Sequence, residues 1–190
     1  GNVYTANEGA NNVTKITPGG AASTLGKTGS WPQAIAIDRS GNIYTANWNS
    51  RNVSKITPKG SSAIYGKTGR RPIGIAVDPH GAVFTTNDGA NSVSKINRKG
   101  RSKVIASTGR RPIGIASDAA GFLYTANFLS NTITEIYPSP KGSPSVLTLN
   151  TVSVLKPGNR KAWIIPFWND VYGSKAECEA AFPGVRAIID

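Results

Sequence analysis

The chain has 190 residues, a length that allows one substantial hydrophobic core in one domain or a small pair of domains. Its 21 glycines and 12 prolines, with no methionine, favour many turns and argue against a helical protein. The formal net charge is +12, and the single cysteine, Cys178, excludes an internal disulfide framework. No apolar run approaches the roughly 18 residues that a membrane-spanning helix needs.

The positive charge is concentrated in the middle of the sequence. Residues 41–120 contain 13 Lys and Arg against three Asp, whereas residues 1–40 and 121–190 each have an excess of one. We therefore expect one side of the molecule to be basic. The sequence begins at Gly1 without an initiator Met or a leader segment, which indicates a mature product or a fragment. We favour a secreted or cell-surface location and leave the compartment open.

A six-residue phrase recurs every 40 residues. It is NVYTAN at 2–7, NIYTAN at 42–47, AVFTTN at 82–87 and FLYTAN at 122–127. Units 1–40, 41–80 and 81–120 align without gaps, and the fourth unit, 121–150, departs from the pattern only after Tyr137. Such a repeat determines the architecture and has to be explained first.

Each unit contains four short segments in which apolar and polar residues alternate, bounded by Gly, Pro, Asn or Asp. In chain order they are exemplified by PQAIAID (32–38), IYTAN (43–47), NVSKI (52–56) and SSAIYGK (61–67). This alternation is typical of strands. Between the first and second segments, Asp38, Asp78 and Asp118 each precede a glycine by three residues, which favours a type I turn over a calcium site. The sequence therefore predicts an all-β fold, a β-propeller of four-stranded blades with 40-residue repeats.

The C-terminal part follows a different pattern. Residues 151–182 are first aromatic, with Trp163 and Trp168, and then predict a short helix over Ser174–Phe182. This segment forms either a degenerate fifth blade or a plug in the ring. Residues 183–190 resemble the first strand of a blade. We expect them to pair beside Val3–Asn7 and close the ring, or to pair with a neighbouring chain in an open assembly.

The repeat P-x-x-I-A-[IV]-D-x-x-G-N-[VI]-Y-T-A-N-x-x-x-N-x-V-x-K-I resembles the NHL-type β-propeller repeat and the related repeats of streptogramin lyases. The resemblance covers residues 1 to about 137 and implies the fold, whereas such propellers host binding modules and enzymes alike. The lyases are expected to use histidines with a glutamate and a magnesium ion. This chain has one histidine, His80, in a turn, and four glutamates. We therefore predict no catalytic residue, no metal site and no cofactor.

The strongest functional signal is a pair of basic loops. GRRP occurs at 69–72 and 109–112, where the first unit has GSWP at 29–32. Arginines on adjacent loops can bind phosphate, sulfate or carboxylate groups through forked hydrogen bonds, and Trp31 adds a stacking surface. NHL propellers that bind single-stranded RNA are similar in using a basic face. A second basic group falls on the turns between third and fourth strands: Lys59, Arg98, Lys99, Arg101 and Lys103. The alternative is that the charge only improves solubility.

The asparagine that ends each phrase allows two interpretations. It either organises a turn or contributes to a ring of amides suited to sugar hydroxyls. The predicted ligand-binding set is Arg70, Arg71, Arg110, Arg111, Trp31, Lys67, Asn47 and Asn87.

We predict from these features a non-enzymatic binding or scaffold propeller whose basic loops engage an anionic partner: an acidic glycan, a nucleic acid or an acidic protein. The alternative is a structural protein that assembles through strand exchange at its termini. A streptogramin-lyase-like enzyme is the least favoured hypothesis.

Overall fold

The computed structural model describes residues 1–137 and 145–150, which belong to one compact unit, Gly1–Val152. Three predictions lie outside the described residues: the aromatic segment with Trp163 and Trp168, the short helix Ser174–Phe182, and the closing strand 183–190.

These residues form four antiparallel sheets in chain order, and a single 3-10 turn, η1 (Asp88–Ala90), is their helical element. The first sheet has three strands: β1 (Val3–Asn7), β2 (Asn12–Ile16) and β3 (Ala22–Lys27). The second has four: β4 (Pro32–Ile37), β5 (Ile43–Asn47), β6 (Asn52–Ile56) and β7 (Ser62–Lys67). The third contains β8 (Pro72–Val77), β9 (Val83–Asn87), β10 (Ser92–Ile96) and β11 (Ser102–Ser107). The fourth contains β12 (Pro112–Ser117), β13 (Leu123–Asn127), β14 (Thr132–Tyr137) and β15 (Ser145–Asn150).

The predicted all-β fold with four-stranded blades is therefore confirmed. The recurring phrase is the second strand of every blade, and its pairing with the third strand keeps one register through the repeats. Ile43 lies opposite Ile56 in the second sheet, as Val83 lies opposite Ile96 in the third. The identical spacing of the repeats thus becomes an identical hairpin.

The phrase is apolar on both faces of its strand because the blades pack face to face. Every residue of β5 is buried. Tyr44 and Ala46 pack towards the third sheet, in a cluster that includes Val83. Ile43, on the other face of the strand, packs with Val13 of the first sheet. A single blade could not bury both faces, so stacked near-copies supply the core.

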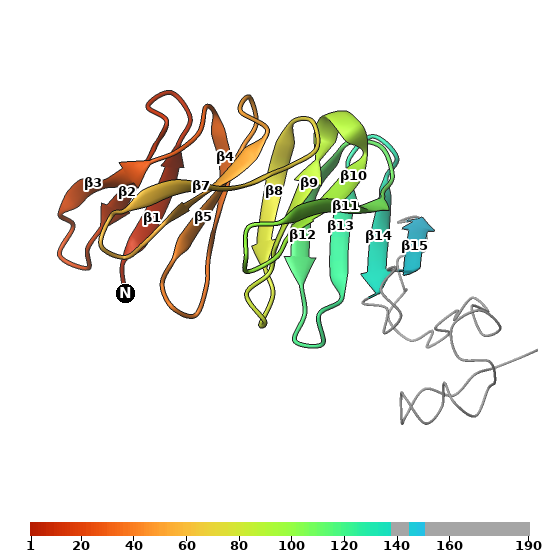
Figure 1. Ribbon diagram of the computed structural model, residues 1–190. Coiled ribbons are helices and arrows are strands. Elements are labelled where there is room, and N and C mark those ends of the chain that lie inside the picture. Colours follow the sequence, from red (N-terminus) through yellow and green to blue (C-terminus); the bar gives the residue numbers. More distant parts are fainter. Residues whose placement is uncertain (138–144, 151–190) are drawn as a thin grey trace, which may run out of the picture. The chain divides into compact units, whose positions relative to one another are not determined.

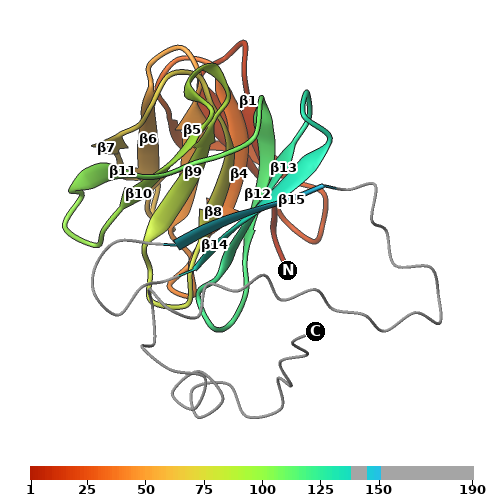
Figure 2. The same cartoon turned by 90° about the vertical axis from the view of Figure 1, so that its right-hand side faces the viewer.

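The first strands of the four-stranded blades lie next to one another, since β4 contacts β8 and β8 contacts β12. In the three-stranded first sheet it is β1, the phrase strand, that contacts β4. Figure 1 shows the sheets succeeding each other from β1–β3 to β12–β15. In Figure 2 the fourth strands β7 and β11 lie at the left, away from β4, β8 and β12. Loops at the two ends of the strands are consequently brought together from different repeats.

The predicted turns between first and second strands are confirmed. Asp38 Oδ1 accepts hydrogen bonds from the backbone N–H groups of Ser40 and Asn42, each at 2.9 Å. The glycine of this turn, Gly41, has a φ of 76°, a conformation that L side chains rarely adopt. Asp78 and Asp118 form equivalent bonds in the next two repeats, so these aspartates cap turns.

Candidate ligand-binding site on the loop face

Six loops of the second, third and fourth sheets lie at the same end of the strands. Three of them, 28–31, 68–71 and 108–111, enter first strands, and the other three, 48–51, 88–91 and 128–131, connect second to third strands. We call this set of loops the loop face. The first strand begins where the second ends, as the pairing of Pro32 with Asn47 shows. This pairing brings both kinds of loop together within each blade.

The last residue of each entering loop adopts the left-handed backbone conformation. The φ angles are 58° at Trp31, 54° at Arg71 and 52° at Arg111, which is uncommon for residues other than glycine. The backbone N–H groups of Trp31 and Arg111 donate to Asn11 Oδ1 and Asn91 Oδ1 of the preceding blade at 2.8 and 2.9 Å. All three carbonyl groups accept a hydrogen bond from the residue that follows the second strand. The backbone of Trp31 and Arg111 is therefore held on both sides, and that of Arg71 through its carbonyl group.

Buried asparagines support the loop face from inside the sheets. Asn47 and Asn87 are 0% exposed. Asn47 Nδ2 donates to Asn52 Oδ1 at 2.7 Å and to Ser54 Oγ at 2.9 Å, while its Oδ1 accepts a bond from Thr45. The structure corrects the predicted placement of Asn47 and Asn87 as ligand-facing amides. Both amides are used inside the sheet, so we leave these two residues out of the proposed site.

The glycine of each entering loop follows from this asparagine. A Cβ atom added at Gly69 would lie 2.7 Å from Asn87 Nδ2, closer than real Cβ atoms approach a neighbour. The Gly69 N–H donates to Ser94 Oγ at 3.1 Å, a hydroxyl that also accepts from Asn87. The sequence T-G before the arginines is thus required by close packing of the loop on the buried amide.

Two tryptophans and an arginine stack on the loop face. The rings of Trp31 and Trp48 have centroids 5.2 Å apart and an interplanar angle of 22°. Arg71, from the next repeat, places its Cζ 5.0 Å from the centroid of Trp48. Trp31 is 45% exposed. A planar cation therefore continues an aromatic stack across the boundary between two blades.

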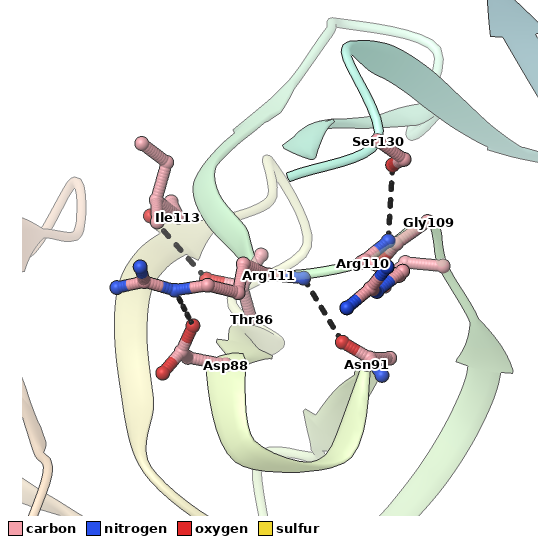
Figure 3. Close-up of polar contacts among 9 residues, drawn as sticks. Thr86, Asp88, Asn91, Gly109, Arg110, Arg111, Ile113 and Ser130 are labelled. Atoms are coloured by element: carbon pink, nitrogen blue, oxygen red, sulfur yellow. Dashed lines mark hydrogen bonds and ion pairs between the residues drawn. The ribbon is translucent and has the colours of Figure 1, made fainter. Parts of the chain in front are cut away.

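The same arrangement continues across the next boundary with an acidic residue. Arg111 Nε lies 2.9 Å from Asp88 Oδ1, and its Cζ lies 5.5 Å from the centroid of Phe128. Figure 3 shows the carboxylate of Asp88 facing the guanidinium of Arg111. This is the one ion pair within residues 1–137 and 145–150, and it leaves the Arg111 side chain 47% exposed.

These contacts form two runs, Trp31–Trp48–Arg71 and Asp88–Arg111–Phe128, which meet where the Asp88 N–H donates to the Arg71 carbonyl at 2.9 Å, so that together they form a row across three blades. We call it the aromatic–arginine ladder, and it consists of Trp31, Trp48, Arg71, Asp88, Arg111 and Phe128. Positions 31, 71 and 111 are equivalent in the repeat, as are positions 48, 88 and 128. The ladder therefore arises from two repeat positions that face each other, occupied by Trp or Arg at the first and by Trp, Asp or Phe at the second.

The other predicted site residues take different places. Arg70 and Arg110 precede the ladder arginines and have exposed side chains, and no described residue forms an ion pair with either of them. Lys67 is the last residue of β7, the outermost strand of the second sheet, and pairs with Asn52 of β6. It is exposed but lies outside the ladder. The second basic group, exemplified by Lys99, lies on turns at the other end of the strands, except for Lys103, which is the second residue of β11.

Sequence reasoning missed Asp88 as part of the site. Trp48 and Phe128 could be identified as aromatic residues near the basic loops. Nothing in the residue type of Asp88 marks it as part of a site that binds anions. The signal that could have found it is position: Asp88 immediately follows the phrase, as Trp48 and Phe128 do. Because the first strand begins opposite the end of the second, that position lies beside the entering loop of its own blade, where the Asp88 N–H donates to the Arg71 carbonyl at 2.9 Å. Its side chain reaches the arginine of the following blade, Arg111.

Titratable groups with shifted pKa values lie at the other end of the strands. Burial, together with the hydrogen bond to Asp38 at 3.0 Å, raises the pKa of Tyr44 well above its ordinary value. Burial opposes ionisation of Asp38, but bonds from Asn42 and Tyr44 outweigh it and lower the pKa of this carboxyl. Burial and Glu135 raise the pKa of Tyr124 to about 12. These groups form a structural network remote from the loop face.

The described residues contain no group of three or more His, Cys, Asp or Glu side chains arranged to hold a metal ion. His80 is exposed in the turn that follows β8. A search of the part of the chain that the structure describes finds no helix of the length and hydropathy needed to cross a bilayer.

Comparisons with known proteins place the fold. No family model matches the chain, and no curated protein matches it. Among solved structures, a streptogramin B lyase has a TM-score of 0.65 at 22% identity, covering 77% of this chain and 51% of that one. A putative gluconolactonase has a TM-score of 0.55 at 15% identity, covering 78% and 60%. The structure of a nidogen/laminin complex gives 0.55 at 16% identity, covering 78% and 75%.

These similar structures include enzymes as well as a complex between two proteins. At such identities the likeness concerns the fold alone, and the chain spans about half the length of the lyase structure. The repeats, the four antiparallel blades and the similar structures agree with one another. The fold of this chain is that of the NHL-type β-propeller proteins.

Proposed function

We propose that this chain is a non-enzymatic β-propeller binding module that holds an anionic partner on its loop face. The observation that supports the proposal best is the aromatic–arginine ladder. It presents Arg71 and Arg111 from two adjacent blades on flat aromatic surfaces, with Arg70 and Arg110 exposed beside them. Guanidinium groups held in this way can form forked hydrogen bonds to phosphate, sulfate or carboxylate groups.

The aromatic members of the ladder favour a partner that has planar or ring-shaped groups between its charges. Trp31 has a partly exposed ring beside Arg71. An acidic sugar or a nucleotide would combine an anionic group with a ring that can stack on such a surface. The absence of a catalytic role is inferred from composition, because a chain with one histidine cannot supply the histidine set that the resemblance to lyases implies.

The repeat itself supplies the variants for a test. The first unit has Ser30 where the later units have Arg70 and Arg110, so Arg70→Ser with Arg110→Ser introduces a residue that the same loop already accommodates. The matched control is Lys59→Ser with Lys99→Ser, which removes the same charge from turns at the other end of the strands. Each protein is titrated with a sulfated heparin oligosaccharide and, separately, with a single-stranded oligonucleotide.

We expect the loop-face variant to lose about tenfold or more in affinity for at least one probe. Its log affinity should also fall less steeply with log salt concentration, by an amount that corresponds to about two fewer ionic contacts. The control should stay within about twofold of the natural sequence. Equal losses in the two variants would show that net charge, not the loop face, attracts anions. If neither probe binds at low salt, an anionic glycan or nucleic acid is not the partner.

A further inference from the structure

The first and fourth sheets each have one face that no described sheet covers. Figure 1 shows them at the two ends of the row of sheets. In each blade, we call the face that packs on the following blade the forward face and the opposite one the backward face. In the second sheet the forward face includes Tyr44 and Val53, and the backward face includes Ile43 and Ile56.

The forward face is buried in every blade that has a successor. Val13, Val53 and Val93 occupy one repeat position in the first three sheets and are each 0% exposed. Ile133 occupies that position in the fourth sheet and is 39% exposed. At the neighbouring position, Tyr44 is 2% and Phe84 is 3% exposed in the second and third sheets, whereas Tyr124 is 36% exposed in the fourth. The fourth sheet thus retains apolar side chains that the repeat uses for packing, but shows them to solvent.

The backward face shows the complementary pattern. Ile43 and Val83 are 0% exposed and Leu123 is 2% exposed, because each packs on the blade before it. Val3 occupies the equivalent position in the first sheet and is 58% exposed. The first sheet therefore shows the kind of surface that covers a forward face elsewhere in the molecule.

These two exposed faces are complementary in the same way as the faces that meet at the three internal junctions between blades. At each junction a valine and an aromatic ring of one blade pack against aliphatic residues of the next, as Val53 and Tyr44 pack against Val83 and Ile96. The fourth sheet offers Ile133 and Tyr124, and the first sheet offers Val3 and Ile16 at the matching positions. Tyr124 and Ile133, two of the large apolar side chains exposed in the described residues, lie together on the forward face of the fourth sheet. Exposed apolar residues grouped on one face are typical of an interaction surface.

We propose that a second copy of this chain covers the fourth sheet, its own first sheet packing by its backward face on the forward face around Ile133. The contact joins two different surfaces, so the interface is heterologous. It produces a closed particle where the rotation closes and a longer chain of copies where it does not. The interface is separate from the loop face, and its test does not depend on anion binding.

The test measures the mass of the full chain in solution by size exclusion with light scattering, in about 0.5 M NaCl to screen charge-driven association. The variants are Ile133→Asp, which charges the forward face of the fourth sheet, and Val3→Asp, which charges the backward face of the first. The matched control is Ile64→Asp, since Ile64 is 58% exposed on the outer strand of an internal blade. Circular dichroism establishes that each variant keeps the β-sheet signal of the natural sequence.

The natural sequence and Ile64→Asp should form particles of at least twice 19.9 kDa, and each face variant alone should be monomeric. An equal mixture of Val3→Asp and Ile133→Asp should restore a particle of two chains, because one intact pair of faces remains between them. A monomeric natural sequence overturns the proposal and would mean that the face is covered within one chain or left bare. A face variant with unchanged mass, or a mixture that stays monomeric, also overturns it.

Discussion

Asp88 and Arg111 form an ion pair across the boundary between the third and fourth sheets, with Asp88 Oδ1 2.9 Å from Arg111 Nε. The side chain of Asp88 is 9% exposed, whereas that of Arg111 is 47% exposed. Asp88 thus orients an arginine whose remaining donors stay accessible. It also competes with any anionic partner for the same charge, which makes it the most informative residue of the ladder to change.

We expect Asp88→Asn to raise the affinity for a heparin oligosaccharide about threefold, or ~0.7 kcal/mol, the size of a partly exposed ion pair. The physical reason is that Arg111 no longer shares its charge with a carboxylate. Glu8→Gln is the control, because Glu8 occupies the equivalent position in the first repeat and is exposed there. Isothermal titration of both variants decides the question. An equal gain in affinity in both variants would show that the change in net charge alone explains it.

A second prediction concerns Trp48, on which both Trp31 and Arg71 stack. Trp48→Ala should destabilise the chain by about 1–3 kcal/mol, since it removes an aromatic pair, a cation–π contact and the packing of a half-buried ring. The midpoint of urea denaturation measures this loss. Phe128→Ala removes only one such contact, with Arg111, and should cost less. A lower denaturation midpoint for Phe128→Ala than for Trp48→Ala would contradict the contacts assigned to the ladder.

How far the sequence alone predicts this molecule depends on whether a feature repeats. The strands, the capping role of Asp38 and the position of the arginine loops follow from a 40-residue period and from turn chemistry, and all were accessible without coordinates. The burial of Asn47 was not, because an asparagine at a strand end satisfies a turn, a ligand or an internal hydrogen bond equally well. Its burial, its hydrogen bonds to Asn52 and Ser54, and the packing of Gly29 against its amide distinguish them. The ion pair of Asp88 could not be predicted for a related reason, since its partner, Arg111, belongs to another repeat.

The packing of Gly69 on Asn87 gives a third prediction. Gly69→Ala places a methyl group where the Asn87 amide lies, and Asn87→Ala removes the hydrogen bonds that this amide donates to the hydroxyls of Ser92 and Ser94. Each variant should lose about 1–3 kcal/mol of unfolding free energy. The double variant should lose less than the sum, because the new methyl group occupies the space that the amide vacates. Strict additivity in denaturant unfolding would show that loop and amide are independent.

The last prediction concerns the pH dependence of the Asp38 turn. The pKa of Asp38 is lowered in the folded chain below its ordinary value of 3.8, so the carboxylate contributes stability that is present above that pH. This contribution is lost as the pH falls through the folded pKa. Asp38→Asn cannot ionise, and its amide replaces an acceptor that now receives bonds from Asn42 Nδ2 and Tyr44.

We therefore expect Asp38→Asn to be about 1–2 kcal/mol less stable near neutral pH and to approach the natural sequence as the pH falls below about 4. Tyr44→Phe provides the control at alkaline pH. The pKa of Tyr44 is raised in the folded chain, so its stabilising contribution is complete below its ordinary value of 10.0 and is lost above it. As the pH rises above about 10, Tyr44→Phe should accordingly lose less unfolding free energy than the natural sequence does. Unfolding free energies measured from about pH 2 to 11 test both, and parallel curves for variant and natural sequence would refute the assignment of these shifts to the Asp38–Tyr44 bond.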